Sequence, residues 1–257
     1  MLNSADIKRM ATEVGFDACG IARADALTDE EYPLRTWLAR GWHAELQYME
    51  RNVEKRMDPR LLVEGARSVI CVVSAYGPPD PDRTDGVAAY AQRREYHEVM
   101  KPMLQELKAR LGIDGKVCCD TVPISDKHWA ARAGLGWIGR HTLLVTPQWG
   151  SWVNLGEIVT TEECSEYSEH SEYSDFCSKC GRCVTACPNQ ALAPLKQSSN
   201  QAIKQSYMLN LNRCTAYYTT HHQRPMPSDL DAHGYTCGCD LCQLACPFNQ
   251  KVGGKTK

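Results

Sequence analysis

The cysteines near the end of the chain have the spacing that most clearly indicates chemistry. The chain contains 14 cysteines. The segment FCSKCGRCVTACP at 176–188 has the pattern C-x-x-C-x-x-C-x-x-x-C-P, and CDLCQLACP at 239–247 repeats its second half. Three thiolates at such short gaps bind one 4Fe-4S cluster, while the fourth thiolate of the run reaches a second cluster. The pattern therefore predicts two adjacent clusters.

The spacing divides the cysteines into two predicted ligand sets. The first set is Cys177, Cys180, Cys183 and Cys246. The second set begins with Cys187, Cys239 and Cys242 and needs one more thiolate. Cys214 is the favoured fourth ligand, because the chain that returns from the first motif to the second passes the same cluster. Cys237 is the alternative, because it lies near the second motif in sequence.

Zinc sites are the main alternative for paired cysteines. Structural zinc is usually held by two C-x-x-C pairs that close around one tetrahedral ion. Three thiols at gaps of two residues match the corners of a cube better, so the pattern favours iron-sulfur clusters. The five remaining cysteines are expected to be small buried apolar residues: Cys19, Cys71, Cys118, Cys119 and Cys164.

Length and composition indicate an intracellular protein with one main domain and a smaller module. The chain has 257 residues and a formal net charge of -2. It begins without the apolar stretch of a signal peptide, and no segment reaches the eighteen or so apolar residues that a membrane helix needs. We therefore expect a cytoplasmic location, where thiols stay reduced and bind metals. The net charge shows no general attraction to nucleic acid, although it leaves room for a local basic patch.

Hydrophobic periodicity predicts an α/β fold for the first part of the chain. Helices are expected over 3–15, with Ser4 as the cap, over 30–50, over 95–112 and in the segment that begins at 127. Strands are expected at 17–24, 68–76, 116–120, 141–146 and 151–160. These elements predict a mixed-sheet domain over 1–160, an acidic linker over 161–176 and a cluster-binding module over 177–257, with a helix over 201–212.

The first domain contains no G-x-G-x-x-G motif after a strand, no P-loop and no clustered His and Glu residues. Several of its segments, followed by both cysteine motifs, instead resemble epoxyqueuosine reductases. The resemblance runs from about residue 1 to 250 and is strongest in EKRMDPRLLVEGARSVICVV, REYHEVMKPML and DTVPISDKHWAARAGLGWIGRHTLLVTPQWGSWVNLGEI. It implies a cobalamin-binding α/β domain, related to that of reductive dehalogenases, followed by a small helical ferredoxin-like module.

The resemblance also implies a reaction and a proton donor. The family removes the epoxide oxygen of epoxyqueuosine in the tRNA wobble position, with base-off cobalamin reduced by electrons from the two 4Fe-4S clusters. Asp120 in CCDTVP matches the proposed proton donor of the family, which suits chemistry in which a released alkoxide needs an acid. Asp126 is the second candidate, although its place before KHWAARAG also suits a helix N-cap.

The resemblance places the cofactor contacts at Arg56, Leu144, Leu155 and Asp240, along with Asp120 itself. The glycines of GLGWIG either let the backbone approach a large planar ligand or form a plain tight turn. Many members of the family continue past the second cluster into helical repeats that help to hold tRNA, whereas KVGGKTK follows the last motif here. Candidate phosphate contacts are then Arg93, Arg94, Arg132, Arg140, Arg213 and Arg224.

Two other functions fit the same cysteines. One is a cobalamin-dependent reductase of a small organohalide or epoxide. The other is an iron-sulfur electron carrier whose first domain only docks a partner. In each case a low-potential donor, such as a ferredoxin or flavodoxin, would supply the electrons.

Overall fold

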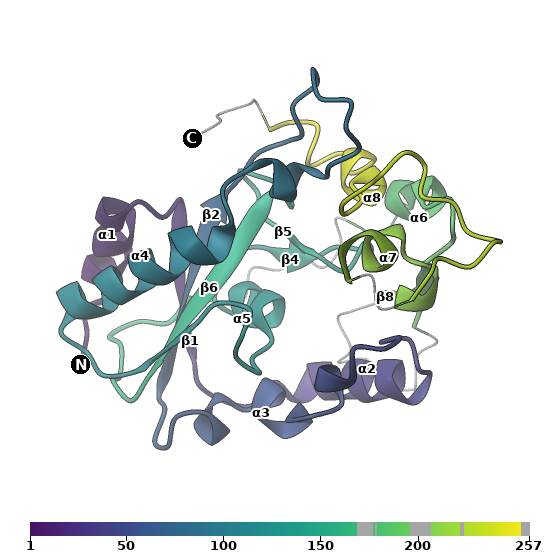
Figure 1. Cartoon of the computed structure of the whole chain (residues 1–257). Coiled ribbons are helices and arrows are strands. Elements are labelled where there is room, and N and C mark those ends of the chain that lie inside the picture. The colour runs from purple at the N-terminus through teal and green to yellow at the C-terminus, as the bar shows by residue number, and fades with distance from the viewer. Residues whose placement is uncertain (169–176, 178, 196–206, 222–223, 253–257) are drawn as a thin grey trace.

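The computed structural model describes residues 1–168, 177, 179–195, 207–221 and 224–252 (Figure 1). The α-helices in this part of the chain are α1 (Ser4–Val14), α2 (Thr28–Ala39), α3 (Val53–Met57), α4 (Tyr96–Leu111), α5 (Asp126–Arg132), α6 (Arg182–Ala186), α7 (Thr215–His221) and α8 (Leu241–Leu244). The strands are β1 (Ala18–Arg23), β2 (Ser68–Ala75), β3 (Lys116–Cys118), β4 (Trp137–Ile138), β5 (Leu144–Val145), β6 (Val153–Thr160), β7 (Leu192–Pro194) and β8 (Tyr207–Leu209). The α/β class expected from the sequence is confirmed.

A four-stranded sheet with the order β1-β2-β6-β3 forms the centre of the first domain. Every pairing in this sheet is antiparallel, so the sheet itself is not mixed as the sequence suggested. The apolar run of β2 fits its central place, because a strand with neighbours on both edges and helices on both faces needs apolar residues throughout. In the register of β2 and β6, Cys71 lies opposite Glu157.

Helices cover both faces of this sheet (Figure 1). α1 and α4 pack on one face, where Ile7, Met100 and Leu104 are fully buried. α5 packs on the other face through Trp129 and Ala130, which contact side chains of β2 and β6. The face that α5 covers also carries Glu157. The loops that follow the strands of this sheet hold the candidate site.

Two helix ends differ from the sequence prediction. Asn3, rather than Ser4, caps α1 by accepting the backbone N–H groups of Ala5 and Asp6, while the Ser4 hydroxyl donates to the carbonyl of Glu166 at 2.6 Å. The helix expected over 30–50 ends at Ala39, because Gly41 has a φ of 63° and turns the chain away.

Two short segments also correct the prediction. The part of 201–212 that the structure describes begins with strand β8, whose residues pair with β7, and ends in the 3-10 helix Leu211–Arg213; 201–206 lie outside the described residues. The strand expected over 141–146 is reduced to Leu144–Val145, because the preceding residues form the turn between β4 and β5.

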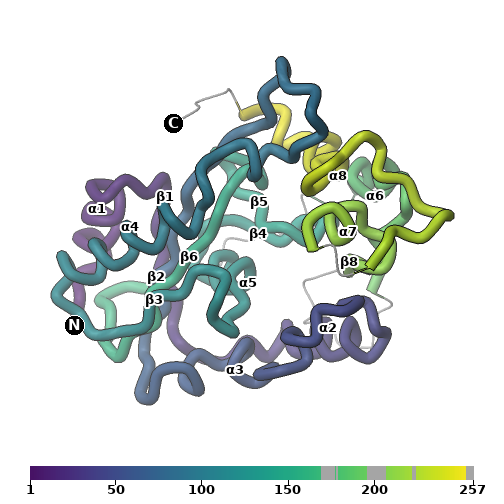
Figure 2. The backbone as a smooth tube through the Cα atoms, in the orientation of Figure 1, coloured from purple at the N-terminus to yellow at the C-terminus, as the bar shows by residue number. Residues whose placement is uncertain are grey.

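The cysteine-rich part packs directly against the first domain. The backbone N–H of Leu211 bonds the carbonyl of Trp42 at 2.9 Å, and Val87 forms an isolated bridge with Cys237. Figure 2 shows the same closeness, with the segment after β2 lying beside the yellow end of the described chain. The predicted domain boundaries remain a prediction. No helix in the described ranges has the length and apolar character needed to cross a membrane.

Candidate functional site

The thiols of the two cysteine motifs come together in two sets of four. α6 and α8 pack against each other and carry Cys183 and Cys242. Burial, and then the neighbouring thiols of Cys177, Cys246 and Cys180, raise the pKa of Cys183 to about 11. The four cysteines predicted as the first ligand set therefore lie close together in space, as their spacing in the sequence predicts.

The second set gathers in the same way around Cys239. Burial, with smaller contributions from Cys214 and Cys187, raises the pKa of this thiol to about 11. The pKa of Cys242 is raised well above its usual value by burial and by the thiols of Cys214, Cys239, Cys183 and Cys187. Because Cys183 belongs to the first set, the two sets are adjacent, as two clusters that exchange electrons must be.

Cys237, the alternative to Cys214, lies elsewhere. Its Sγ is 4.0 Å from the hydroxyl of Tyr90, and its backbone bridges to Val87. A cavity of about 240 Å³ is lined by Cys187, Cys214, Cys239 and Cys242, but Cys237 does not reach it. This arrangement supports Cys214 as the fourth member of the second set.

The donor chemistry of both sets suits iron-sulfur clusters. Thiolates are the ligands of such clusters, and metal binding removes the protons of the thiols that become ligands. Within the described ranges, no three Cys, His, Asp or Glu side chains are arranged to hold a single metal ion.

The five other cysteines are placed as expected. Cys71, Cys118, Cys119 and Cys164 are buried, and Cys19 is half-buried beside them in β1. Burial raises the pKa of Cys19 and that of Cys119 to about 12. A thiol with so high a pKa is protonated at neutral pH and behaves as a small apolar residue.

Asp120 lies in the turn that follows β3, at the edge of the central sheet. Its φ is 59°, in the left-handed region that residues other than glycine rarely adopt. The side chain is 65% exposed, and its Oδ2 lies 3.3 Å from Nε2 of His97, whose Nδ1 contacts Glu95 at 2.5 Å. Burial and the nearby Asp120 carboxylate raise the pKa of Tyr96 above its usual value. The turn therefore presents a carboxyl to solvent beside a histidine and a tyrosine.

Arg56 on α3 faces the same region. Burial lowers the pKa of its guanidinium, and the Asp126 and Asp120 carboxylates act in the opposite direction. Its Nη2 donates to the carbonyl of Tyr48 at 3.2 Å, while its buried Nε has no hydrogen-bond partner among the described residues. An enclosed donor of this kind suits an amide or phosphate oxygen of a bound cofactor.

Asp126 does not act as an N-cap, because it is the first residue of α5 and faces Glu157 of β6. Glu157 is fully buried, and neither of its carboxyl oxygens has an amide, hydroxyl or cationic donor in the described structure. Burial, and then the Asp126 carboxylate, raise the pKa of Glu157 well above its usual value. A raised pKa favours the protonated form of Glu157, and a protonated carboxyl can donate a hydrogen bond to a neighbouring carboxylate.

The other expected cofactor contacts differ in their surroundings. Leu144 is 3% exposed within the core, and Leu155 is half-buried against the same core. Asp240 is almost fully buried: its Oδ2 accepts the backbone N–H of Ala89 at 2.6 Å, and its Oδ1 accepts from Gln243 at 3.3 Å. Asp240 thus ties the second cysteine motif to the first domain.

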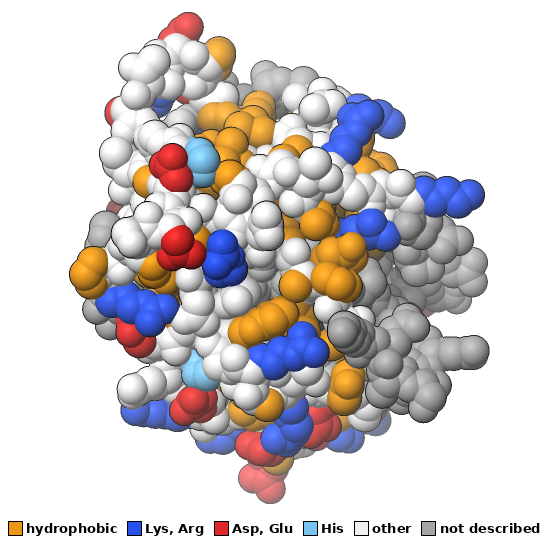
Figure 3. Space-filling model, turned by 90° about the vertical axis from the view of Figure 1, so that its right-hand side faces the viewer, with side chains coloured by type: hydrophobic (Ala, Val, Ile, Leu, Met, Phe, Trp, Pro, Cys, Tyr) orange, Lys and Arg blue, Asp and Glu red, His pale blue; other side chains and the backbone are white. Residues whose placement is uncertain are grey.

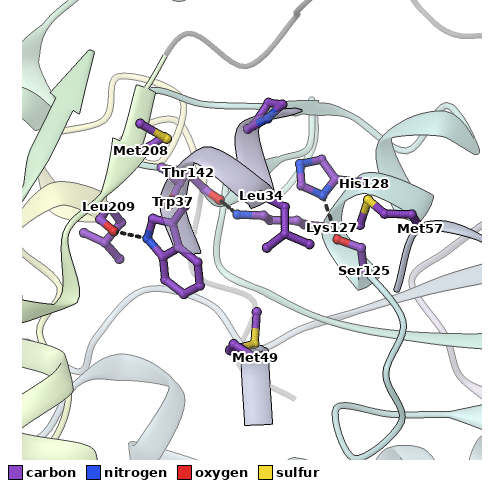
Figure 4. Close-up of a pocket in the computed structure, with 11 residues that line it drawn as sticks. Leu34, Trp37, Met49, Met57, Ser125, Lys127, His128, Thr142, Met208 and Leu209 are labelled. Carbon is purple, nitrogen blue, oxygen red and sulfur yellow. Dashed lines mark hydrogen bonds between the residues drawn. The ribbon is translucent and has the colours of Figure 1, made fainter. Parts of the chain in front are cut away.

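A second cavity, of about 170 Å³, lies between α2 and α5 (Figure 4). It is largely apolar, with Leu34, Trp37 and Met57 around Lys127, whose Nζ donates to the carbonyl of Thr142 at 2.8 Å. Burial lowers the pKa of Lys127 to about 8. Sequence reasoning missed this lysine, because nothing in KHWAAR distinguishes it from a surface residue of a short helix.

The turn between β4 and β5 separates the two cavities. Thr142 lines the smaller one, while His141 and Leu143 line the larger one. The glycines before this turn serve packing: a Cβ at Gly136 would lie 2.1 Å from the carbonyl oxygen of Val145. Close packing against the backbone of β5 therefore accounts for this glycine.

These features fit a large planar cofactor with polar side groups. Apolar space lies in the cavity between α2 and α5, and Arg56 and Asp126 each contribute a buried polar atom without a hydrogen-bond partner among the described residues. Cobalamin has this combination of an apolar macrocycle and amide groups, so the residues present suit it.

Two family models match the chain. The model described as "Epoxyqueuosine reductase QueG, DUF1730" matches residues 56–121, and a 4Fe-4S double cluster binding domain matches residues 176–249. The chain is 34% identical to the epoxyqueuosine reductase of Cellulophaga algicola over 253 residues, which cover 95% of this chain and 78% of that protein. It is 38% identical to the enzyme of Gloeobacter violaceus, over 97% of this chain and 77% of that protein.

The chain belongs to the epoxyqueuosine reductase family.

Solved structures agree with this assignment. The epoxyqueuosine reductase of Streptococcus thermophilus superposes with a TM-score of 0.84 at 26% identity, covering 98% of this chain and 68% of that one. A family member crystallised with an epoxyqueuosine-modified tRNA stem loop has the same TM-score and identity, over 98% of this chain and 67% of that one. A B12-dependent reductive dehalogenase shares the fold, with a TM-score of 0.58 at 16% identity over 97% of this chain and 31% of that one.

The chain is therefore an iron-sulfur oxidoreductase with two 4Fe-4S clusters and cobalamin as its cofactors.

Proposed function

We propose that this chain reduces epoxyqueuosine to queuosine in the wobble position of tRNA. The observation that carries the proposal is that, in a chain of this family, two four-thiol sets lie together and one of them borders a cavity of about 240 Å³, while Arg56 and Asp120 lie within electrostatic reach of each other. The conversion replaces the epoxide by a carbon-carbon double bond and releases the epoxide oxygen as water. It consumes two electrons and two protons. When bound, the clusters supply single electrons and cobalamin supplies a strongly reducing cobalt.

Within this reaction we assign the cluster ligands as the two sets of cysteines. The first cluster would be held by Cys177, Cys180, Cys183 and Cys246, and the second by Cys187, Cys214, Cys239 and Cys242. The grouping of the thiols in space supports both assignments. Arg56, Leu144 and Leu155 would contact cobalamin, with Asp240 positioning the second motif beside it.

Asp120 would donate a proton to the oxygen that leaves the epoxide. The contact at 3.3 Å with His97 orients the carboxyl, and the 65% exposed side chain can recover its proton from solvent. Bound cofactor and substrate would cover this side chain. Glu157 and Asp126 form a buried pair of carboxyls, and burial raises the pKa of both.

We further propose the anticodon arm of tRNA as the partner. The family member crystallised with a tRNA stem loop supports this choice. Of the six arginines expected to bind phosphate, five donate to groups within the described chain: Arg93, Arg132, Arg140, Arg213 and Arg224. Figure 3 shows basic, acidic and apolar side chains interspersed over the described part of one face, without a single basic patch. A flipped wobble base needs a local pocket more than a large basic surface.

A cytoplasmic location and a low-potential electron donor complete the proposal. Both tRNA and reduced thiols are found in the cytoplasm, and a ferredoxin or flavodoxin has the potential that iron-sulfur clusters of this kind need.

The test uses protein reconstituted without oxygen with iron, sulfide and cobalamin. It is incubated with a chemical reductant and tRNA that carries epoxyqueuosine, and the nucleosides are analysed by mass spectrometry after digestion. We expect the modified nucleoside to lose one oxygen atom. Intact epoxide with fully loaded protein would overturn the proposal, and dehalogenation of a small aryl halide in a parallel reaction would assign the chain to small substrates instead.

A further inference from the structure

His141 is a buried histidine in the turn between β4 and β5. Its side chain is almost fully buried, with 3% of the residue exposed. The backbone N–H of Leu143 donates to Nδ1 of the ring at 3.2 Å. A ring nitrogen that accepts a hydrogen bond carries no proton, so the proton of this imidazole is on Nε2.

The Nε2–H group has no hydrogen-bond partner among the described residues. A buried donor without an acceptor destabilises the fold, and native structures rarely keep one that serves no purpose. The turn does not need this group for its shape, because it is closed by the bonds from Gly139 N–H to the Leu143 carbonyl and from Thr142 N–H to the Gly139 carbonyl. The Nδ1 contact only orients the ring.

The side chain of His141 lines the same cavity as the second cysteine set. This cavity of about 240 Å³ is bounded by Cys187, Cys214, Cys239 and Cys242, with His141 on the wall that the β4–β5 turn contributes. The four thiols come from the cysteine-rich module, whereas the histidine comes from the first domain. The histidine that carries the unpartnered donor therefore borders the space that the second cluster would fill.

We propose that Nε2–H of His141 donates a hydrogen bond to a sulfur of the second 4Fe-4S cluster and raises the reduction potential of that cluster. The inference rests on the proposed function only in that it requires the second cluster to be present. Reduction adds negative charge to the cluster sulfurs, and a hydrogen bond stabilises the reduced form more than the oxidised one. His141 is thus a positioning and tuning residue that exchanges no electron or proton.

The test is an anaerobic redox titration of the reconstituted protein, monitored by electron paramagnetic resonance. The signal of the second cluster is the one that Cys214→Ser removes. In His141→Phe, which keeps a planar ring but lacks the donor, we expect a negative shift of the second midpoint potential, with the first cluster, the cobalt and the iron content unchanged. His141→Gln, which restores an N–H donor, should recover part of the shift.

His128→Phe is the matched control, because His128 is a partly buried histidine on the wall of the other cavity. It should leave both clusters at their wild-type potentials. An unchanged second potential in iron-replete His141→Phe would overturn the proposal, and a shift of the cobalt potential alone would place the hydrogen bond on cobalamin instead.

A measurement on the unaltered protein keeps the proposal testable if the phenylalanine variant loses iron. Protein labelled with ¹⁵N-histidine should show a nitrogen coupling to the reduced second cluster in pulsed electron paramagnetic resonance, and absence of that coupling would contradict the proposal. None of these measurements uses tRNA, so failure of the nucleoside assay and failure of this inference are separate results.

Discussion

At the scale of single residues, the proposed acid is unusual because its backbone is strained and its side chain is open to solvent. Asp120 has a φ of 59°, and a non-glycine residue in this region costs on the order of 1 kcal/mol. The strained turn directs the carboxyl to the edge of the sheet, beside His97 and Tyr96. Function accounts for this conformation better than folding does, since a glycine would adopt it without strain.

Asp120→Asn tests the role of the carboxyl as acid. The amide keeps the size of the side chain but has no acidic proton, so turnover of epoxyqueuosine in tRNA should fall by about 10²–10⁴. Cobalamin and iron contents should stay near those of the wild type, as measured by absorption spectroscopy and iron analysis. Asp6→Asn, at an exposed aspartate on α1, is the control and should keep full activity. Wild-type turnover in Asp120→Asn would move the acid to Asp126, Tyr96 or water.

The fourth ligand of the second cluster is also decided at single residues. Cys214→Ser should reduce the iron content from about eight to about four atoms per chain, because one cluster loses a thiolate. Cys237→Ser should retain both clusters, since the Cys237 thiol contacts Tyr90 and lies outside the cavity of the second set. Iron analysis and electron paramagnetic resonance of both variants provide the measurement. Loss of iron in Cys237→Ser alone would reverse the assignment.

At the scale of elements, the contact between α5 and β6 links the core to the site. α5 brings Asp126 to the buried Glu157 of β6, and the turn before α5 holds Asp120. The same helix packs Trp129 into the core on this face of the sheet. The raised pKa of Glu157 at this contact therefore makes the stability of the domain depend on pH.

Glu157→Gln tests this pH dependence. The pKa of Glu157 is raised on folding, so its stabilisation is fully present below the usual pKa of glutamate and is lost as the pH rises toward the folded pKa. Glutamine does not titrate and can still donate to Asp126. The variant should thus gain stability relative to the wild type as the pH rises, by about 1.4 kcal/mol for each unit of pKa shift.

The measurement is the melting temperature of the reconstituted protein between pH 4.5 and 8, recorded for wild type and variant. The exposed Glu98 on α4 provides the control, and Glu98→Gln should follow the wild-type curve at every pH. Parallel curves for Glu157→Gln and the wild type would show that Glu157 is ionised in the folded protein.

At the scale of the whole molecule, the cysteine-rich module and the first domain meet along several contacts. Asn249 donates to Ser151 and accepts the N–H of the same residue, and Asp240 accepts from Ala89. Most of the arginines considered for tRNA also serve internal contacts of this kind. Arg94 is the exception, because it is exposed and makes no ion pair within the described ranges.

Arg94→Ala tests whether this arginine contacts phosphate. Each lysine or arginine bound to phosphate adds to the slope of log affinity against log salt concentration, through release of counterions. Removing one contact should weaken tRNA binding and reduce that slope by about one. Fluorescence anisotropy with a labelled anticodon stem loop, at several salt concentrations, measures both effects. Arg94→Lys should keep the slope, and Arg9→Ala on α1 should change neither quantity.

The cluster chemistry, the α/β class and the order of most elements could be predicted from the sequence alone. Iron-sulfur ligation depends on thiols a few residues apart, and a buried strand such as β2 depends on a local run of apolar residues. Both features can therefore be recognised in a short stretch of sequence. The resemblance that named the family rested on the same kind of local segments. The contact between Asp120 and His97 could not be predicted in this way, because the two residues are 23 positions apart in the chain.

Only the tertiary structure decided which distant side chains share a space. It brought Cys214, rather than Cys237, to the cavity of the second set, paired Glu157 with Asp126, and placed His141, with its unpartnered nitrogen, on the wall of the cavity that the thiols line. It also replaced part of a predicted helix by β8, because pairing with β7 outweighs local helical preference. Burial and the loss of water create these pKa shifts and unpaired donors, and burial depends on packing between segments that are far apart in sequence.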